Sequence, residues 1–98
     1  MIDLSRITGF EWGKGNIDKS YEKHNITPNE AEEVFIDENI WFQDDVDHSQ
    51  REARFTAIGK TSQKHVLFIA FTVRGSKIRI ISARRANIKE RREYEEKT

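Results

Sequence analysis

Residues 65–85 carry the sequence HVLFIAFTVRGSKIRIISARR, which contains the strongest strand signals in the chain. The run His65–Arg74 is apolar at both odd and even positions, so it predicts a central strand of a sheet with both faces covered. Gly75 and Ser76 predict a two-residue hairpin turn. The segment Ile78–Arg84 then returns beside the first strand, and together they predict an antiparallel hairpin at the centre of the fold.

Strand pairing and alternation place the arginines of this hairpin. Antiparallel pairing puts Arg74 near the turn and Arg84 at the opposite end of the sheet, so the two need not touch. Alternation sends Arg84 and Arg85 to opposite faces. It groups Arg84 with Ile78, Ile80 and Ser82, and Arg85 with Arg79, Ile81 and Ala83. A cation at a strand end is held in position, which suits binding or catalysis on an anionic substrate.

The segments around the hairpin complete an α+β order. The pattern predicts helices at 16–24, from 27 and from about 87, and further strands at 40–44 and 51–59. Thr27 and Glu30 form a capping box at the start of the second helix. The predicted fold is a single domain over residues 1–98, in which two N-terminal helices precede an antiparallel meander sheet and one helix follows it.

Composition limits the chemistry. The chain of 98 residues is long enough for one hydrophobic core. It has no cysteine, so disulfides, zinc–thiolate sites and thiol nucleophiles are excluded. Neither a signal peptide nor an apolar run of membrane-spanning length is recognisable. A cytoplasmic protein is therefore expected.

The formal net charge of +0 conceals two oppositely charged segments. Residues 29–54 contain nine acidic and two basic side chains, a net charge of −7. Residues 77–92 contain seven basic side chains and one acidic side chain, a net charge of +6. Such segregation can create a local anion-binding field. It is equally compatible with two solvated faces that pair with each other.

Eight short motifs stand in order along the chain: FEW (10–12), KH (23–24), EEVF (32–35), HS (48–49), RF…IG (54–59), FTVRG (71–75), IRIISAR (78–84) and ERREYEE (90–96). In order and spacing they resemble the BrnT toxin family, over nearly the whole chain. Each motif is weak alone, but the set in register is specific.

This resemblance implies a RelE-like fold and a ribonuclease activity that halts translation. It also implies a BrnA-like antitoxin, a DNA-binding protein of the ribbon–helix–helix type, in a complex of two toxins and two antitoxins. Operator DNA would be contacted only through the antitoxin, and no membrane partner is implied.

Cleaving RNA without a metal or cofactor requires a base for the 2′-hydroxyl, cations for the phosphorane and an acid for the leaving oxygen. Arg84 is the foremost catalytic candidate, followed by Arg74, Lys23 and His24. The candidate substrate contacts are Trp12, Arg54, Arg85 and Lys89. Glu11 and Glu90 are candidates for orienting an arginine through a bidentate pair.

Several candidates have structural alternatives. His24 lies on the apolar stripe of its helix and could be a packed histidine, and Trp12 could belong to the core. Arg54 could pair with Glu52 on the surface. His48 lies in DDVDHS, which lacks a full metal-ligand pattern and is interpreted as a polar turn. For the whole protein, the alternative to an endoribonuclease is a non-catalytic module that binds nucleic acid or only the antitoxin.

Overall fold

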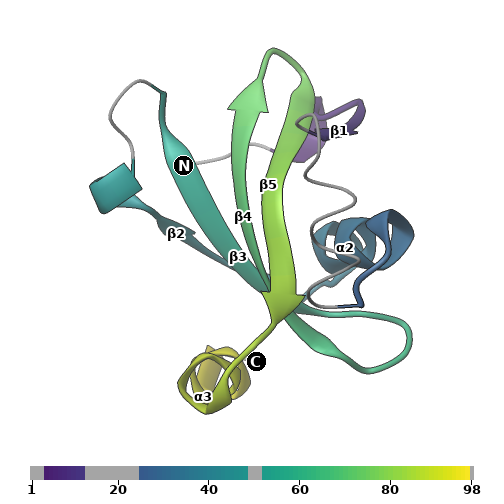
Figure 1. The fold of residues 1–98 in the computed structure, drawn as a ribbon, viewed down its shortest axis with the longest axis vertical. Coiled ribbons are helices and arrows are strands. Elements are labelled where there is room, and N and C mark those ends of the chain that lie inside the picture. Colours follow the sequence, from purple (N-terminus) through teal and green to yellow (C-terminus); the bar gives the residue numbers. More distant parts are fainter. Residues whose placement is uncertain (1–3, 13–24, 49–51, 98) are drawn as a thin grey trace.

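The computed structural model describes residues 4–12, 25–48 and 52–97. Five strands form one sheet in the order β1-β5-β4-β3-β2. The strands are β1 (Gly9–Trp12), β2 (Trp41–Asp44), β3 (Arg54–Lys60), β4 (Val66–Arg74) and β5 (Lys77–Arg85). The described helices are α2 (Pro28–Glu33) and α3 (Ile88–Lys97), with short 3-10 turns η1 (Leu4–Arg6), η2 (Val34–Ile36) and η3 (Val46–His48). Figure 1 shows α2 beside the sheet and α3 near one end of it.

The predicted α+β class is confirmed, but the predicted purely antiparallel meander is wrong. Strands β2 to β5 do form an antiparallel meander, whereas β1 adds to the edge of β5 in parallel. The sheet is therefore mixed. A strand of four residues is too short to show a reliable period, and its partner lies 68 positions away, between Gly9 and Lys77. The predicted helix at 16–24 falls outside the described residues.

Strand β4 is the middle strand, as predicted, and one of its faces forms the core. We call this side of the sheet the core face, on which Leu67, Ile69 and Phe71 are fully buried. Phe71 belongs to a cluster of aromatic rings with Phe10, Phe35, Phe42 and Phe55, and the Phe35 ring lies 5.1 Å from it, edge-on. The prediction that both faces of β4 are fully covered is wrong, because on the other face Phe68 and Ala70 remain half-buried.

The hairpin between β4 and β5 has the predicted two-residue turn, and only Gly75 of the two turn residues has a positive φ, of 60°. Further along, Ala70 pairs with Ser82 while Phe71 pairs with Ile80. Ile81 is thus an extra residue in β5, a β-bulge.

The bulge reverses the alternation of β5. Ile78 and Ile80 are buried on the core face, whereas Ser82 and Arg84 pair with Ala70 and Phe68 on the opposite face. The predicted grouping of Arg84 with Ile78 and Ile80 is therefore wrong. We call this second side the arginine face, defined by Arg54, Arg79 and Arg84.

The predicted cap of α2 at Thr27 forms, but the Glu30 carboxylate contacts Thr61 and His65, and in the described part of the chain no return bond to Thr27 completes the capping box. The Thr27 hydroxyl accepts a hydrogen bond from the Glu30 amide at 3.2 Å, with Pro28 at the first helical position. Asn25 adopts a left-handed φ of 57°. At α3, the Glu90 amide donates to Asn87 at 2.8 Å and the Asn87 amide donates back to Glu90 at 2.9 Å. Within the described residues, neither helix has the length and hydropathy to cross a bilayer.

Candidate functional site

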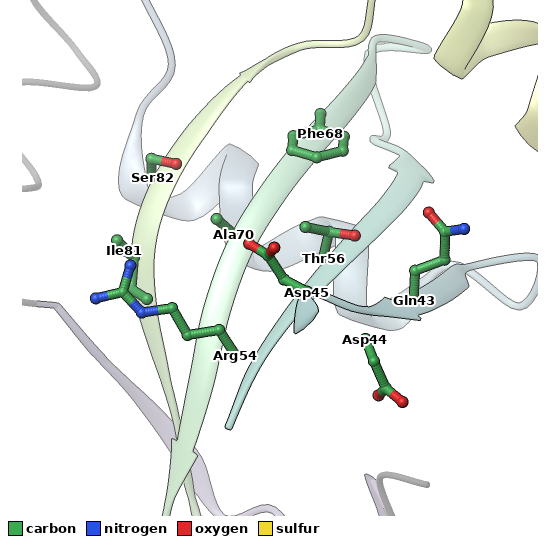
Figure 2. Close-up of a pocket in the computed structure, with 9 residues that line it drawn as sticks. All are labelled: Gln43, Asp44, Asp45, Arg54, Thr56, Phe68, Ala70, Ile81 and Ser82. Carbon is green, nitrogen blue, oxygen red and sulfur yellow. The ribbon is translucent and has the colours of Figure 1, made fainter. Parts of the chain in front are cut away.

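A pocket of about 480 Å³ opens on the arginine face (Figure 2). Strand alternation directs Arg54 and Thr56 of β3 and Phe68 and Ala70 of β4 to this face, and Ile81 and Ser82 at the bulge of β5 complete this side. Its lining residues are Gln43, Asp44, Asp45, Arg54, Thr56, Phe68, Ala70, Ile81 and Ser82. In Figure 2, Phe68 lies at one end of the pocket and Arg54 at the other, with Thr56 and Ala70 between them. The pocket thus combines an aromatic ring, a cation and carboxylates.

Arg84 is held at the Phe68 end of this pocket by a stacking contact and an ion pair, and one of its terminal nitrogens also donates to the Arg85 carbonyl at 3.2 Å. The Arg84 guanidinium carbon lies 4.3 Å from the centroid of the Phe68 ring. Its two terminal nitrogens each donate to one Glu90 carboxylate oxygen at 2.8 Å, a bidentate pair. A guanidinium held both by stacking and by a bidentate carboxylate is oriented in advance of any ligand.

Glu90 is itself fixed by the N-terminus of α3. Its side chain is only 13% exposed, and one oxygen also accepts the Asn87 amide at 2.9 Å. Burial raises the pKa of Glu90, but the hydrogen bonds from Arg84 and Asn87 outweigh it and leave the pKa below its usual value. The carboxylate is therefore ionised at neutral pH, and Arg84 keeps its orientation.

A second group of arginines lies at the far end of the same face, toward the β4–β5 turn. Arg74 forms a bidentate pair with Glu52 at 3.0 and 3.2 Å, and Arg79 lies 3.4 Å from Glu11. The hydrogen bond from Arg74, with the positive charges of Arg54 and Arg79, lowers the pKa of Glu52. These side chains are partly exposed to solvent, so the pairs hold charge on the surface and contribute little stability.

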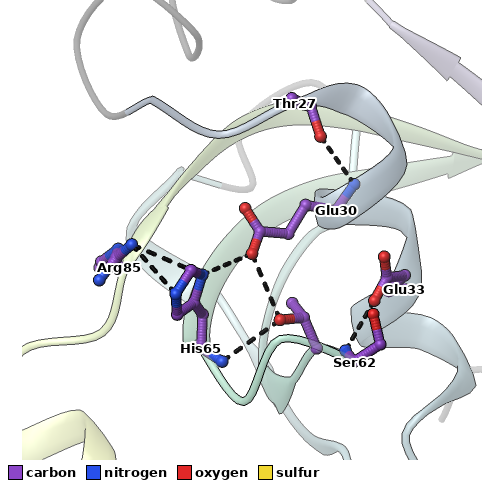
Figure 3. Close-up of polar contacts among 7 residues, drawn as sticks. Thr27, Glu30, Glu33, Ser62, His65 and Arg85 are labelled. Carbon is purple, nitrogen blue, oxygen red and sulfur yellow. Dashed lines mark hydrogen bonds and ion pairs between the residues drawn. The ribbon is translucent and has the colours of Figure 1, made fainter.

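Arg85 lies on the other side of β5, in a separate polar cluster (Figure 3). One of its terminal nitrogens lies 3.2 Å from His65 Nε2, and His65 Nδ1 lies 2.6 Å from a Glu30 oxygen. The same Arg85 nitrogen lies 3.5 Å from His65 Nδ1, so the guanidinium group lies close to both ring nitrogens. Glu30 also accepts from the Thr61 hydroxyl at 3.3 Å. The cluster ties α2 to the β3–β4 connection and to the end of β5.

The structure therefore distributes the candidate residues over several places. Arg54 lines the pocket and Arg84 stacks on Phe68 at its edge, where Glu90 orients it. Arg74 and Glu11 lie toward the hairpin turn. Lys89 is exposed in the first turn of α3. Trp12 packs against the core, and its Nε1–H donates to Glu32 at 3.2 Å. Lys23 and His24 lie outside the described residues.

Sequence reasoning did not select Phe68, Asp45 or Arg79. Phe68 belongs to an apolar run that predicts only a core strand, and Asp45 belongs to an acidic turn. Arg79 was only assigned to a face of its strand by alternation, and nothing in the local sequence marks it as a site residue. For a metal, the described residues hold no cluster of three or more His, Cys, Asp or Glu side chains arranged as ligands.

Two carboxylates attach helix α3 to the rest of the fold: Glu90 in its first turn and Asp37, which lies outside the helix. Besides the Glu90 pair, the buried Tyr94 hydroxyl donates to Asp37 at 2.6 Å, and Asp37 also accepts the Lys60 amide at 2.7 Å. Burial raises the pKa of Asp37, but the hydrogen bonds from Tyr94, Lys60 and Asn39 outweigh it, so the net pKa is lowered. Conversely, burial and the Asp37 contact raise the pKa of Tyr94.

Acid is therefore expected to loosen α3. A carboxyl group with a lowered folded-state pKa stabilises the fold above its unfolded pKa, about 4, and this contribution is lost as pH falls through the folded value. The melting temperature should fall as pH drops below about 4. The near-ultraviolet circular dichroism of Trp41 should weaken with it, because Lys97 of α3 lies 5.7 Å from the centroid of the Trp41 ring. Asp37→Asn should flatten this acid transition, whereas Glu38→Gln, at an exposed side chain, should not. An acid profile identical in both variants would contradict the assignment.

The fold is shared with a solved ribonuclease toxin. It matches the crystal structure of the Brucella abortus ribonuclease toxin BrnT, determined at 1.1 Å resolution, with a TM-score of 0.62 and 18% sequence identity. The match covers 82% of this chain and 97% of the Brucella chain. At this identity it shows a common fold. No curated protein sequence matches the chain.

A family model described as "Ribonuclease toxin, BrnT, of type II toxin-antitoxin system" matches residues 12–90. The fold and this match define the class of the protein, a ribonuclease toxin of a type II toxin–antitoxin system. The chain belongs to the BrnT family. The resemblance seen in the sequence motifs is confirmed, and an antitoxin partner follows from membership of a type II system.

Proposed function

We propose that the arginine face is the surface on which this toxin cleaves RNA, with Arg84 as its central cation. The observation that carries the proposal is the position of Arg84, which is stacked on Phe68 and paired with Glu90 at the edge of the pocket. Glu90 occupies the two terminal nitrogens, which leaves the Nε side of the guanidinium as the edge that faces a substrate phosphate. A preorganised cation of this kind stabilises charge that develops in the transition state.

The proposed reaction is an internal transfer at phosphorus that needs no metal. The 2′-hydroxyl of one nucleotide loses its proton and attacks the adjacent phosphorus, and the 5′-oxygen of the next nucleotide leaves and is protonated. Arg84 stabilises the negative charge of the phosphorane. Lys23 and His24 stay our candidates for the proton transfers, since both side chains can act near neutral pH.

Incubation of purified toxin with end-labelled RNA in excess EDTA tests this function. Cleavage should persist and should yield fragments that end in a 2′,3′-cyclic phosphate and begin with a 5′-hydroxyl. Retention of RNA without cleavage would favour the alternative, a nucleic-acid-binding module. Loss of cleavage in EDTA that returns with magnesium would contradict the metal-independent mechanism.

For the partner, we propose a BrnA-like antitoxin of the ribbon–helix–helix type in a cytoplasmic complex of two toxins and two antitoxins, with operator DNA bound only by the antitoxin. The charge segregation supports a protein partner, because the acidic segment 29–54 and the edge strands β1 and β2 offer docking surfaces. Since β2 borders the pocket, an antitoxin docked there would also exclude RNA from the arginine face. Light scattering of the co-purified pair checks the stoichiometry, and a one-to-one complex at all concentrations would exclude it.

A further inference from the structure

We propose that the pocket on the arginine face is a subsite for an unpaired guanine base of the RNA substrate. In this subsite Phe68 supplies the stacking surface, Arg54 pairs with the O6 and N7 acceptors, and Asp45 accepts from the N1 and N2 donors. The inference rests on the proposed function, namely that RNA lies on the arginine face, and adds to it the identity of the base that is read.

The charge of the pocket argues for a base in place of a phosphate. Its lining contains one cation, Arg54, and two carboxylates, Asp44 and Asp45. A phosphate would meet more negative than positive charge in this space. A base is neutral, and it can use both the carboxylate and the guanidinium as hydrogen-bonding partners. The phosphate contacts then fall to Arg84 and to the arginines toward the hairpin turn.

The shape and the aromatic wall fit a flat ring. The pocket volume of about 480 Å³ accommodates a base with part of its ribose. Phe68 lines the pocket and is half-buried. Because Arg84 stacks on one face of its ring, the base would stack on the other face. Single-stranded RNA is commonly bound by stacking unpaired bases on such rings, and each stack contributes about 1–3 kcal/mol. Stacking alone tolerates any base, so the choice depends on the polar walls.

The polar walls match guanine better than the other three bases. Guanine alone presents two adjacent acceptors, O6 and N7, which suit a bidentate guanidinium, and two adjacent donors, N1–H and N2–H, which suit a bidentate carboxylate. Cytosine and adenine offer a carboxylate one amino group next to an acceptor nitrogen that would repel it. Uracil offers one donor between two acceptors.

The backbone holds the two reading residues next to each other. The Asp45 amide donates to the Arg54 carbonyl at 2.9 Å, just beyond the last pair of the β2–β3 ladder, Asp44 and Phe55. Figure 2 shows the Asp45 side chain directed toward Ala70 and the Arg54 side chain directed toward Ile81. Both also interact within the protein. A bound base would therefore replace some of these contacts within the protein. For this reason, the clearest measure of the subsite is the base preference of RNA cleavage.

The test uses short RNAs of one parent sequence. At each position in turn the base is replaced by the other three, and the rate of cleavage is measured for every RNA. Wild-type toxin should cleave best with guanine at one position, by roughly ten- to hundredfold over the other bases. Asp45→Asn should lose this preference, because an amide cannot accept two hydrogen bonds side by side. Asp47→Asn is the matched control, with the same change two residues along and outside the pocket lining, and should keep the preference.

Arg54→Met provides a second variant in case Asp45→Asn does not fold, and it should also reduce the preference. Cleavage by wild-type toxin with equal rates for all four bases would overturn the guanine subsite and leave the proposed function intact. If no RNA is cleaved, the proposed function fails, and binding of guanosine and adenosine dinucleotides decides the subsite separately. Equal affinity for the two dinucleotides would then overturn it.

Discussion

Arg84→Ala is expected to lower the rate of RNA cleavage by roughly 100- to 1000-fold, the usual effect of removing one preorganised group that stabilises transition-state charge. The guanidinium is fixed between Phe68 and Glu90, so no rearrangement is needed when the phosphorane forms. Single-turnover cleavage of labelled RNA measures the effect. Arg84→Lys should recover only part of the rate, because an ammonium cannot pair with Glu90 in bidentate geometry and stack on Phe68 at once.

Loss of Arg84 also leaves Glu90 partly buried without its partner, so the single variant should lose stability, by about 1–3 kcal/mol. The double variant Arg84→Ala/Glu90→Gln separates the two effects. It should regain most of the stability, because a neutral amide costs less to bury, and should regain none of the activity. Recovery of cleavage in the double variant would show that Arg84 acts only by holding the fold.

Arg85 is the natural comparison. It lies next in the chain but on the opposite side of β5, against His65. Arg85→Ala should therefore reduce cleavage far less than Arg84→Ala, chiefly through weaker RNA association at higher salt. If Arg85→Ala were the more damaging of the two, the reacting phosphate would have to lie on the opposite side of the sheet.

Phe71→Ala is expected to destabilise the fold by about 3–5 kcal/mol, a large fraction of the stability of a small domain. Phe71 is fully buried in the middle strand, and its ring contacts those of Phe35, Phe42 and Phe55. The small side chain would leave a cavity that rigid neighbours on three strands and η2 cannot fill. Denaturant unfolding followed by tryptophan fluorescence measures the change.

Phe68→Ala is the matched control on the same strand. Phe68 is half-buried on the arginine face, so its loss should cost much less stability. It removes the ring on which Arg84 stacks, and it should therefore reduce RNA cleavage in a protein that is still folded. A stability loss equal to that of Phe71→Ala would mean that the arginine face is part of the core.

Much of the candidate site depends on residue types that the sequence displays. Arg84 was selected as a cation at a strand end, Arg54 as a candidate substrate contact and Glu90 as a carboxylate that could orient an arginine. The structure brings these three to one face. Phe68 and Asp45 were not selected, because an apolar strand residue and a turn carboxylate have no local pattern that marks them as site residues. Only their shared position around one pocket does so.

The sequence by itself determined the local elements of this protein: the β4 strand, the Gly75–Ser76 turn, the cap of α2 at Thr27 and the helix that begins near Asn87. These depend on interactions between residues a few positions apart, so their signals lie within short windows. Membership of the BrnT family was also evident in the spacing of the motifs.

Only the tertiary structure decided how the faces are assembled. The parallel addition of β1 depends on pairing with a strand 68 residues away, and the bulge at Ile81 depends on how β5 fits against β4. A single extra residue moves every later side chain of a strand to the other face. Arg84 lies on the same face as Phe68 and Arg54 for that reason, because the register of a strand depends on its neighbours in the sheet and on the core it covers.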